Sequence, residues 1–389
     1  MTGAAPFGLY VHWPFCRSKC PYCDFNSHVA EAIDHRRWRD AYRREMEAMA
    51  PRVAGRAPAS IFFGGGTPSL MEPETVATVI DTARVLWPEG WRAGEPEITL
   101  EANPTSIEAA KFAAFRDAGV NRVSVGVQAL DDEALRFLGR EHSADEALAA
   151  LAVAQETFAR VNADMIYARP GQGVSDWRSE LRRLISMGLG HVSLYQLTIE
   201  RGTPFFGLHN KGAFALPDDE TAAALYEETG AVLAESGLFP YEVSNYARPE
   251  DECRHNLIYW RYGDYLGIGP GAHGRVPGRD GCPVATVNAR RPGDWLERAE
   301  ATGTGLSEET PLEPRVRLEE MVMMGLRLSE GIDDDAVARV GAGGIDRAFD
   351  PQRLARLVAG GFIAREGTRL RATGDGRMRL NAVVAELLA

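Results

Sequence analysis

The sequence has fewer basic than acidic residues. Its 43 lysines and arginines are outnumbered by 55 aspartates and glutamates, which gives a formal net charge of −12 over 389 residues. Proteins that bind nucleic acid present a basic face that displaces counterions from the phosphate backbone. The acidic balance therefore argues against a nucleic-acid partner.

Long apolar runs are also missing. No run approaches the roughly 20 residues that a membrane-spanning helix needs. The first residues lack the cationic start and the apolar stretch of a signal peptide. We therefore expect a cytoplasmic protein that reaches membranes only through its partners.

Cysteine is scarce, because the chain has only five. Three of them, Cys16, Cys20 and Cys23, lie close together in the stretch "YVHWPFCRSKCPYCDF". In the reducing cytoplasm, such a cluster is more typical of a metal site than of a disulfide framework. Cys253 and Cys282 are expected to be ordinary core or surface residues.

The spacing of the three cysteines leaves two kinds of metal site open. Pro14 and Pro21 disfavour a helix here, and a loop can wrap three thiolates around one centre. An iron-sulfur cubane usually takes four cysteines, so three ligands leave one iron open, as catalytic metal centres do. Zinc is the alternative, with His28 completing a C-x3-C-x2-C-x4-H set.

Short β-rich runs alternate with longer amphipathic stretches through the first two thirds of the chain. Strands are predicted at 9–12, 60–63, 97–100, 122–126, 163–167 and 191–196. Helices are predicted at 34–49, 73–86, 106–117, 144–158, 176–187 and 218–236. This alternation predicts parallel strands with right-handed crossovers, in a doubly wound sheet or in a barrel.

Polar and glycine-rich segments follow the ends of these strands. They are the cysteine loop, "GGGTP" at 64–68, "EANP" at 101–104, "GVQ" at 126–128, Asp164 and Gln196. In a barrel, all of them would meet at one mouth, where barrel enzymes have their chemistry. We therefore predict an α/β fold with a partial (β/α)6 barrel that resembles a TIM barrel.

Three segments are predicted along the chain. Residues 1–240 form the barrel, residues 241–306 form an aromatic and glycine-rich extension packed on it, and residues 307–389 form a helical domain. The closing stretch "GGFIAREGTRLRATGDGRMRLNAVVAELL" predicts a hairpin between short helices and a last helix, as in a winged helix. The lack of a clear basic recognition helix favours a structural or protein-binding role for it.

The cysteine loop resembles that of the radical S-adenosylmethionine (SAM) superfamily. Its C-x3-C-x2-C spacing follows the first predicted strand, and an aromatic residue, Tyr22, precedes the third cysteine. The resemblance implies that Cys16, Cys20 and Cys23 hold a [4Fe-4S] cluster and that the remaining iron chelates SAM. An electron from the cluster would then cleave SAM to a 5′-deoxyadenosyl radical.

Further motifs resemble the HemN and HemW branch of this superfamily, which handles tetrapyrroles. They are "YVHWPFC", "GGTP", "EANP", "SVGVQ", "LGREHS" and "DMIY", in this order. The resemblance implies SAM contacts from Tyr10, Tyr22, Gly65, Gly66, Thr67, Glu101, Gln128, Arg140 and Asp164. The sequence departs from the branch at Ala168 and Arg169, where glycine and leucine usually precede Pro-Gly-Gln.

Two features favour the haem chaperones of this branch, the HemW type, over its oxygen-independent coproporphyrinogen III oxidases, the HemN type. Phe25 stands where the oxidases have a further cysteine, and the first strand begins without the extension that the oxidases carry. Downstream, "HNLIYW" at 255–260 resembles the H-N-x-x-Y-W signature of the chaperones. The resemblance implies that His255 ligates haem iron, with aromatic walls beside the macrocycle.

The resemblance thus implies a protein that binds haem and passes it to haem proteins, membrane respiratory enzymes among them. It also implies a donor of electrons or haem, and it leaves a homodimer open. The alternatives are a coproporphyrinogen III oxidase, which would decarboxylate propionate side chains, and another radical SAM enzyme such as a methylase.

Overall fold

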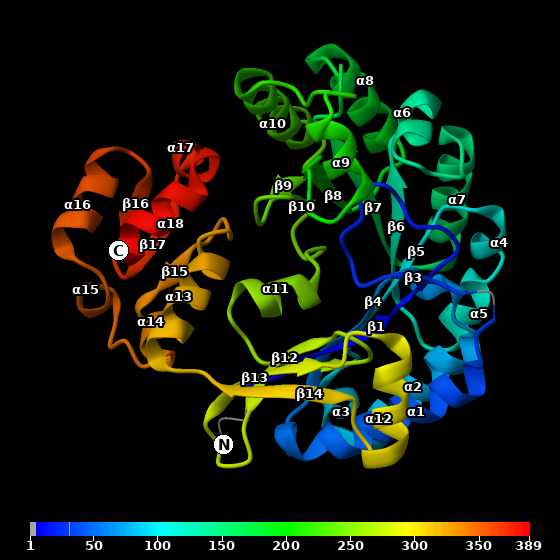
Figure 1. Ribbon diagram of the computed structural model, residues 1–389. Helices are drawn as coiled ribbons and strands as arrows, with labels where there is room; N and C mark the ends of the chain where they lie inside the picture. Colours follow the sequence, from blue (N-terminus) through cyan, green and yellow to red (C-terminus); the bar gives the residue numbers. More distant parts are fainter. Residues whose placement is uncertain (1–4, 31) are drawn as a thin grey trace.

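Parallel strands form the centre of the fold in the computed structural model, which describes residues 5–30 and 32–389 (Figure 1). Six of them lie side by side in chain order: β1 (Phe7–Trp13), β4 (Pro58–Gly65), β5 (Glu97–Ala102), β6 (Arg122–Gln128), β7 (Arg160–Tyr167) and β8 (His191–Gln196). These strands are mostly buried, because parallel strands have both faces covered. Each of the six predicted strands lies within one of them.

Helices connect the parallel strands and cover the outer face of the sheet. The longer ones are α1 (His35–Met49), α2 (Pro73–Leu86), α7 (Ala144–Thr157), α8 (Val174–Ile185) and α10 (Asp219–Ala234). The shorter ones are α3 (Glu89–Ala93), α4 (Ser106–Ala109), α5 (Phe112–Asp117), α6 (Asp132–Phe137) and α9 (Pro204–Asn210), with 3-10 turns η1 (Ala50–Val53) and η2 (Pro68–Leu70). N-cap residues mark the start of three of these helices. The side chains of Asp34, Ser143 and Asp218 accept hydrogen bonds from backbone amides in the first turns of α1, α7 and α10.

One predicted helix is in fact two short helices. The segment 106–117 is broken between α4 and α5, just after Glu108. The Glu108 carboxylate is buried and turns inward, where it accepts hydrogen bonds from the Ser69 hydroxyl and the Asn103 backbone. A tertiary contact therefore decides where this helix breaks.

The sheet does not close on itself. Beside β1 lies β11 (Tyr265–Ile268), parallel to it, followed by β12 (His273–Pro277), β13 (Pro283–Asn288) and β14 (Leu306–Pro311), which are antiparallel to one another. Beyond β8 lie β10 (Asn245–Ala247) and β9 (Phe239–Pro240). Within residues 5–30 and 32–389, the order of strands runs from β14 to β9 without joining these two edges. The predicted α/β fold and partial barrel are confirmed.

A helical module with its own apolar core closes the chain. It contains α13 (Pro314–Gly325), α14 (Asp334–Arg339), α15 (Ile345–Ala348), α16 (Pro351–Ala359), α17 (Gly374–Met378), α18 (Leu380–Leu388), β15 (Ile332–Asp333), β16 (Ile363–Glu366) and β17 (Arg369–Ala372). The three strands form a small antiparallel sheet, which includes the predicted hairpin and gives a winged-helix-like arrangement. Figure 1 shows this module in orange and red beside the barrel, with α17 turned toward α10.

Two further helices complete the fold. In the extension, α11 (Arg254–Trp260) contacts β4 and β1, and α12 (Pro292–Thr302) packs on α1. None of the helices in the described part of the chain combines the length and the apolarity that crossing a bilayer requires.

Candidate functional site

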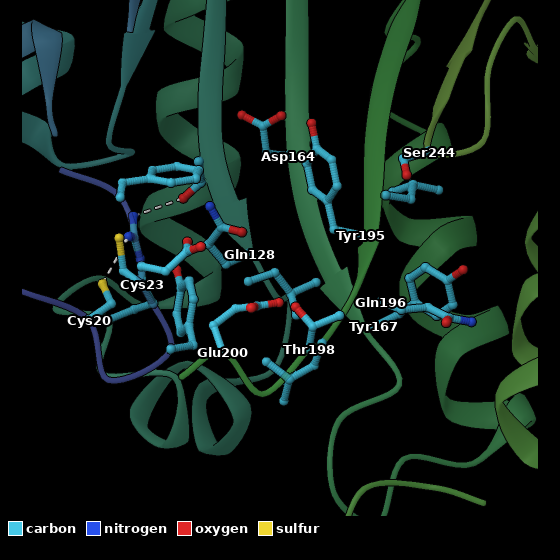
Figure 2. Close-up of a pocket in the computed structure, with 18 of the residues that line it drawn as sticks. Cys20, Cys23, Gln128, Asp164, Tyr167, Tyr195, Gln196, Thr198, Glu200 and Ser244 are labelled. Carbon is cyan, nitrogen blue, oxygen red and sulfur yellow. Dashed lines mark hydrogen bonds between the residues drawn. The ribbon is translucent and has the colours of Figure 1, made fainter. Parts of the chain in front are cut away.

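A cavity of about 1080 Å³ opens at the carboxyl ends of the parallel strands. Its walls come from the cysteine loop, from the ends of β4 to β8, and from α10 and α17. Figure 2 shows Cys20 and Cys23 on one side of it, with Gln128 and Asp164 projecting from the strands behind. The cavity is lined by all the predicted cofactor residues except Tyr10 and His255: Cys16, Cys20, Cys23, Tyr22, Gly65, Gly66, Thr67, Glu101, Gln128, Arg140 and Asp164.

The cysteine loop follows β1 and is held by a short parallel pairing of β2 (Phe15–Cys16) with β3 (His28–Val29). Its three thiols are free and partly buried against the cavity. Burial raises the pKa of the Cys16 and Cys23 thiols. Metal binding requires thiolates, so polar groups that favour the anion matter at this loop.

Such groups lie beside each sulfur atom. The Arg140 guanidinium donates to Cys20 Sγ at 3.5 Å, and the Thr67 hydroxyl donates to Cys16 Sγ at 3.4 Å. The Ser27 hydroxyl lies 4.0 Å from Cys23 Sγ. Donors of this kind stabilise thiolates and the sulfur ligands of iron-sulfur clusters.

A cubane and a single zinc ion place different demands on the three cysteines and His28. Among the described residues, no three histidine, cysteine, aspartate or glutamate side chains converge as ligands of one ion. A tetrahedral zinc site needs its ligands around one point at about 2.0–2.3 Å, whereas a cubane takes each thiolate on a different iron. His28, the fourth ligand in the alternative zinc set, bonds the Asn26 side chain at 3.2 Å. The donors beside the three sulfur atoms, and the His28 ring bonded to Asn26, fit a cubane held by the cysteines alone.

The glycine loop approaches the segment before the cysteine loop so closely that positions 65 and 66 have no room for a side chain. Gly65 has φ +117°, and a Cβ atom there would lie 2.5 Å from the His12 ring. A Cβ atom on Gly66 would lie 2.7 Å from the Phe15 carbonyl oxygen. The Gly65 amide donates to the Glu101 carboxylate at 3.1 Å, so backbone polar groups face the cavity.

Glu101 and Asp164 form a pair of partly buried carboxyl groups on neighbouring walls of the cavity. Burial, and next the nearby Asp164, raise the pKa of Glu101 to about 8. Burial also raises the pKa of Asp164, although its carboxylate accepts hydrogen bonds from Ser124 Oγ at 2.8 Å and from Asn162 Nδ2 at 2.9 Å. Two such groups can accept from ammonium or hydroxyl groups of a bound ligand.

Arg140 and Gln128 lie between these carboxyl groups and the cysteines. Arg140 Nη2 donates to Asn103 Oδ1 at 2.6 Å and to the Gly126 carbonyl at 3.0 Å, while its buried Nε has no partner among the described residues. Gln128 has φ +70°, and the pairing of β6 with β7 shifts register just before it. The irregular backbone turns the Gln128 side chain into the cavity (Figure 2).

Tyr10 lies behind the cavity. Its hydroxyl group is 2.9 Å from His12 Nδ1, and the His12 ring lies directly against Gly65. Tyr10 therefore supports the glycine loop through His12. The structure does not place it on the cavity wall.

His255 lies at the opposite end of the barrel. The first residue of β5, Glu97, accepts hydrogen bonds from the Arg254 and His255 amides, so α11 begins at the amino-terminal ends of the strands. His255 is 1% exposed, with Nδ1 2.8 Å from Ser60 Oγ and Nε2 3.0 Å from the Tyr259 hydroxyl. Burial lowers its pKa to about 3. An iron ligand at this position would have to exchange one of these partners, and haem ligation by His255 stays a prediction.

Several cavity residues were not singled out from the sequence. Asn103 stands within the quoted "EANP" motif and links Arg140 to Thr67, since its Nδ2 lies 3.3 Å from Thr67 Oγ1. Tyr195 and Ser244 come from β8 and the turn before β10, and Arg377 comes from the C-terminal module. No local pattern marks these last three.

A three-cysteine loop after β1 and a glycine loop after β4, at the mouth of a partial barrel, define the class of radical SAM proteins. The model of the radical SAM superfamily matches residues 10–184, and that of the HemN C-terminal domain matches residues 312–379.

Comparison with similar proteins assigns the chain to one family within the radical SAM class. "Heme chaperone HemW" of Escherichia coli is 36% identical over 100% of both chains, and "Heme chaperone HemW" of Mycobacterium tuberculosis is 37% identical over 98% of this chain and 95% of that one. "Radical S-adenosyl methionine domain-containing protein 1, mitochondrial" of Bos taurus is 43% identical over 85% of this chain and 75% of its own. The chain belongs to the HemW family of radical SAM proteins.

The fold is also that of a solved structure. Coproporphyrinogen III oxidase (HemN) from Escherichia coli superposes with a TM-score of 0.81 and 24% identity, over 98% of this chain and 90% of that one. At this identity the likeness shows the shared fold alone, including the C-terminal module.

Proposed function

We propose that this chain is a haem chaperone of the HemW type, which binds haem and transfers it to acceptor haem proteins. One observation carries the proposal: the likeness to "Heme chaperone HemW" of Escherichia coli extends over the whole of both chains. The proposal includes a cytoplasmic protein that meets membrane respiratory enzymes as acceptors, a donor of haem or electrons, and assembly as a homodimer.

The barrel is proposed to hold a [4Fe-4S] cluster and SAM. Cys16, Cys20 and Cys23 hold three irons of the cluster, which, when bound, supplies an electron that can cleave SAM. The hydrogen bonds to Cys16 and Cys20 from Thr67 and Arg140 support this assignment.

The remaining cavity residues are proposed as SAM contacts. Glu101 and Asp164 suit the ribose hydroxyls or the ammonium group, and the Arg140 guanidinium, which lines the cavity, suits the carboxylate. Gly65, Gly66, Thr67, Gln128 and Tyr22 line the space between them, and Tyr10 supports the glycine loop. The predicted segments 1–240, 241–306 and 307–389 remain our proposal for the division of the chain into domains.

His255 is the axial ligand that the sequence supplies. For haem to reach its ring, the hydrogen bond to Ser60 or the one to Tyr259 must break. The assignment therefore requires a rearrangement around the buried His255 ring on haem binding, which hydrogen exchange of the α11 amides with and without haem would detect.

Haem titration and transfer test the proposed function. The anaerobically reconstituted full chain is titrated with haem by its Soret absorption, and the loaded protein is mixed with a haem-free cytochrome. We expect binding at micromolar concentration or tighter, and transfer faster than from haem-loaded serum albumin. A protein that binds no haem, or that never releases it to the acceptor, would contradict the proposal. An unchanged titration of His255→Ala would contradict only the axial ligand.

The second candidate is an oxygen-independent coproporphyrinogen III oxidase. The shared fold with HemN favours it, whereas Phe25, 60% exposed on the cavity wall, occupies the position of the oxidases' further cysteine. Incubation with coproporphyrinogen III, SAM and a strong reductant decides between them. Release of carbon dioxide would replace the chaperone with the oxidase.

A further inference from the structure

A second, smaller cavity lies at the opposite end of the barrel from the cysteine loop. Its volume is about 220 Å³, and its wall includes the first residues of three parallel strands: Arg122 of β6, Arg160 of β7 and His191 of β8. Arg248 and Asp251, from the segment between β10 and α11, also line it. Its lining includes none of the proposed cofactor residues, so it is separate from the site at the mouth of the barrel.

Three guanidinium groups line this cavity, and two of them have donors to spare. Arg122 and Arg160, which are neighbours in the register of β6 and β7, share the carboxylate of Glu97 at 3.5 and 2.6 Å. The buried Nε of Arg160 has no hydrogen-bond partner in the described part of the chain. Arg248 is exposed and forms no ion pair with any of the described residues. Arg160 and Arg248 can therefore donate to a ligand.

One carboxylate in the wall faces these cations without a hydrogen bond to them. Asp251 Oδ1 lies 3.8 Å from Arg160 Nε, which is beyond hydrogen-bond distance. Asp251 Oδ2 lies against Gly190, in the space that a Cβ atom on this glycine would occupy. A small group that both accepts and donates hydrogen bonds could thus reach Arg160 and Asp251 together.

The cavity has a surplus of positive charge. Its three arginines meet two carboxylates, those of Asp251 and Glu97, in a chain whose net charge is −12. His191 adds no charge, because burial, and next Arg122 and Arg160, lower its pKa well below the ordinary value. The local field therefore favours an anion.

Hydrogenphosphate matches both the cations and the carboxylate. Its P–O⁻ oxygens suit the guanidinium donors, and its P–O–H group can donate to the Asp251 carboxylate. Sulfate has a similar size and charge but no O–H group at neutral pH, so it would meet Asp251 only as a like charge. The volume of about 220 Å³ suits such a small ion, since sites for drug-sized ligands enclose roughly 300–1,000 Å³.

We propose that this cavity binds inorganic phosphate as hydrogenphosphate, with Arg160 and Arg248 on the P–O⁻ oxygens and Asp251 accepting from the P–O–H group. The inference goes beyond the proposed chaperone function and does not depend on it. Arg160 also holds Glu97, which accepts the amide that starts α11. A phosphate ion that binds only the folded chain would therefore stabilise this end of the barrel.

Calorimetric titration of the anaerobically reconstituted full chain tests the site. The probes are sodium phosphate, sodium sulfate and glycerol 3-phosphate, at constant ionic strength and about pH 7.5, where a phosphate monoester has mostly lost its second proton. Arg248→Gln and Asp251→Asn are compared with the wild type and with Arg182→Gln, which removes the same charge from an exposed position on α8. Equal urea midpoints without phosphate show that the variants fold alike.

We expect the wild type and Arg182→Gln to bind one phosphate per chain, at least tenfold more tightly than sulfate or glycerol 3-phosphate. Arg248→Gln should bind phosphate at least tenfold more weakly. Asp251→Asn should bind sulfate more tightly than the wild type does, because an amide can donate where the carboxylate repels. The site is wrong if the wild type binds no phosphate, or if Arg248→Gln binds it unchanged. Equal affinity of the wild type for sulfate or for the ester would overturn the assignment of hydrogenphosphate.

Discussion

Arg140 donates a hydrogen bond to the sulfur of Cys20 at 3.5 Å, across 120 residues of sequence. Its second guanidinium nitrogen is fixed by Asn103 and by the Gly126 carbonyl. A fixed cation next to a thiolate ligand stabilises the added electron of a reduced cluster. We therefore expect Arg140→Gln to lower the midpoint potential of the reconstituted cluster by on the order of 60 mV, a tenfold change for a one-electron couple.

An anaerobic redox titration without SAM, followed by electron paramagnetic resonance, measures this potential. Arg136→Gln is the matched control, because Arg136 is exposed one turn earlier on α6. An equal potential in both variants would show that the contact with Cys20 does not tune the cluster.

Loss of one cysteine of the loop should abolish the cluster. Cys16→Ser, Cys20→Ser and Cys23→Ser each remove one of three thiolates, and two protein ligands do not retain a cubane. Iron and sulfide assays after anaerobic reconstitution should give about four of each per chain for the wild type, and far less for each variant. Cys282→Ser, at an exposed position, should keep the wild-type content. Stoichiometric zinc without sulfide in the wild type would contradict the cubane.

Glu101 should make the stability of the cofactor-free protein depend on pH. Its pKa is raised from 4.5 to about 8, so the folded chain holds a proton that the unfolded chain releases. The resulting stabilisation is present in full below about pH 4.5 and is lost, at about 1.4 kcal/mol per pH unit, as the pH rises toward 8. The Glu101→Gln variant should lose this dependence in urea unfolding from pH 5 to 9.

Glu45 provides a fully buried carboxyl group for comparison. Burial raises its pKa to about 7, so Glu45→Gln should remove most of its slope below pH 7 and change the slope only slightly as the pH approaches 8. If the free energy of unfolding of Glu101→Gln fell with pH between 7 and 8 as steeply as that of the wild type, Glu101 would be ionised in the folded protein well below pH 8.

Glu97 should be essential for stability, although it lies far from the cavity. Its buried carboxylate pairs with Arg160 at 2.6 Å and with the buried Arg122 at 3.5 Å, and it also caps α11. Glu97→Ala leaves two guanidinium groups without this partner, so we expect a loss of about 3–5 kcal/mol in the free energy of unfolding. Glu95→Ala, at an exposed position, should change it by less than about 0.5 kcal/mol. Equal denaturation midpoints would contradict a structural role for Glu97.

The sequence predicted the parallel strands well because buried parallel strands are short apolar runs between turn residues. It could not predict the break after Glu108, since the partners of that side chain, Ser69 and Asn103, lie on other segments. Nor could it predict that Tyr265–Ile268 lies beside β1, because a parallel pairing over such a separation has no local signature.

Most of the candidate site could be predicted for a related reason. Polar residues at the ends of successive parallel strands meet wherever the strands form a barrel. His255 shows the limit, because its motif does not reveal which end of the barrel α11 covers. Arg377 shows another limit, since only the packing of the C-terminal module brings it to the cavity.

The position of β1 has a consequence for the synthesis of the chain. This first strand is hydrogen-bonded on one side to β4 and on the other to β11, which leaves the ribosome much later. Until Tyr265–Ile268 has been made, β1 presents an open edge of apolar strand, a feature that promotes aggregation. We therefore expect the barrel to mature late in translation, through a slow long-range pairing that nascent-chain chaperones would protect.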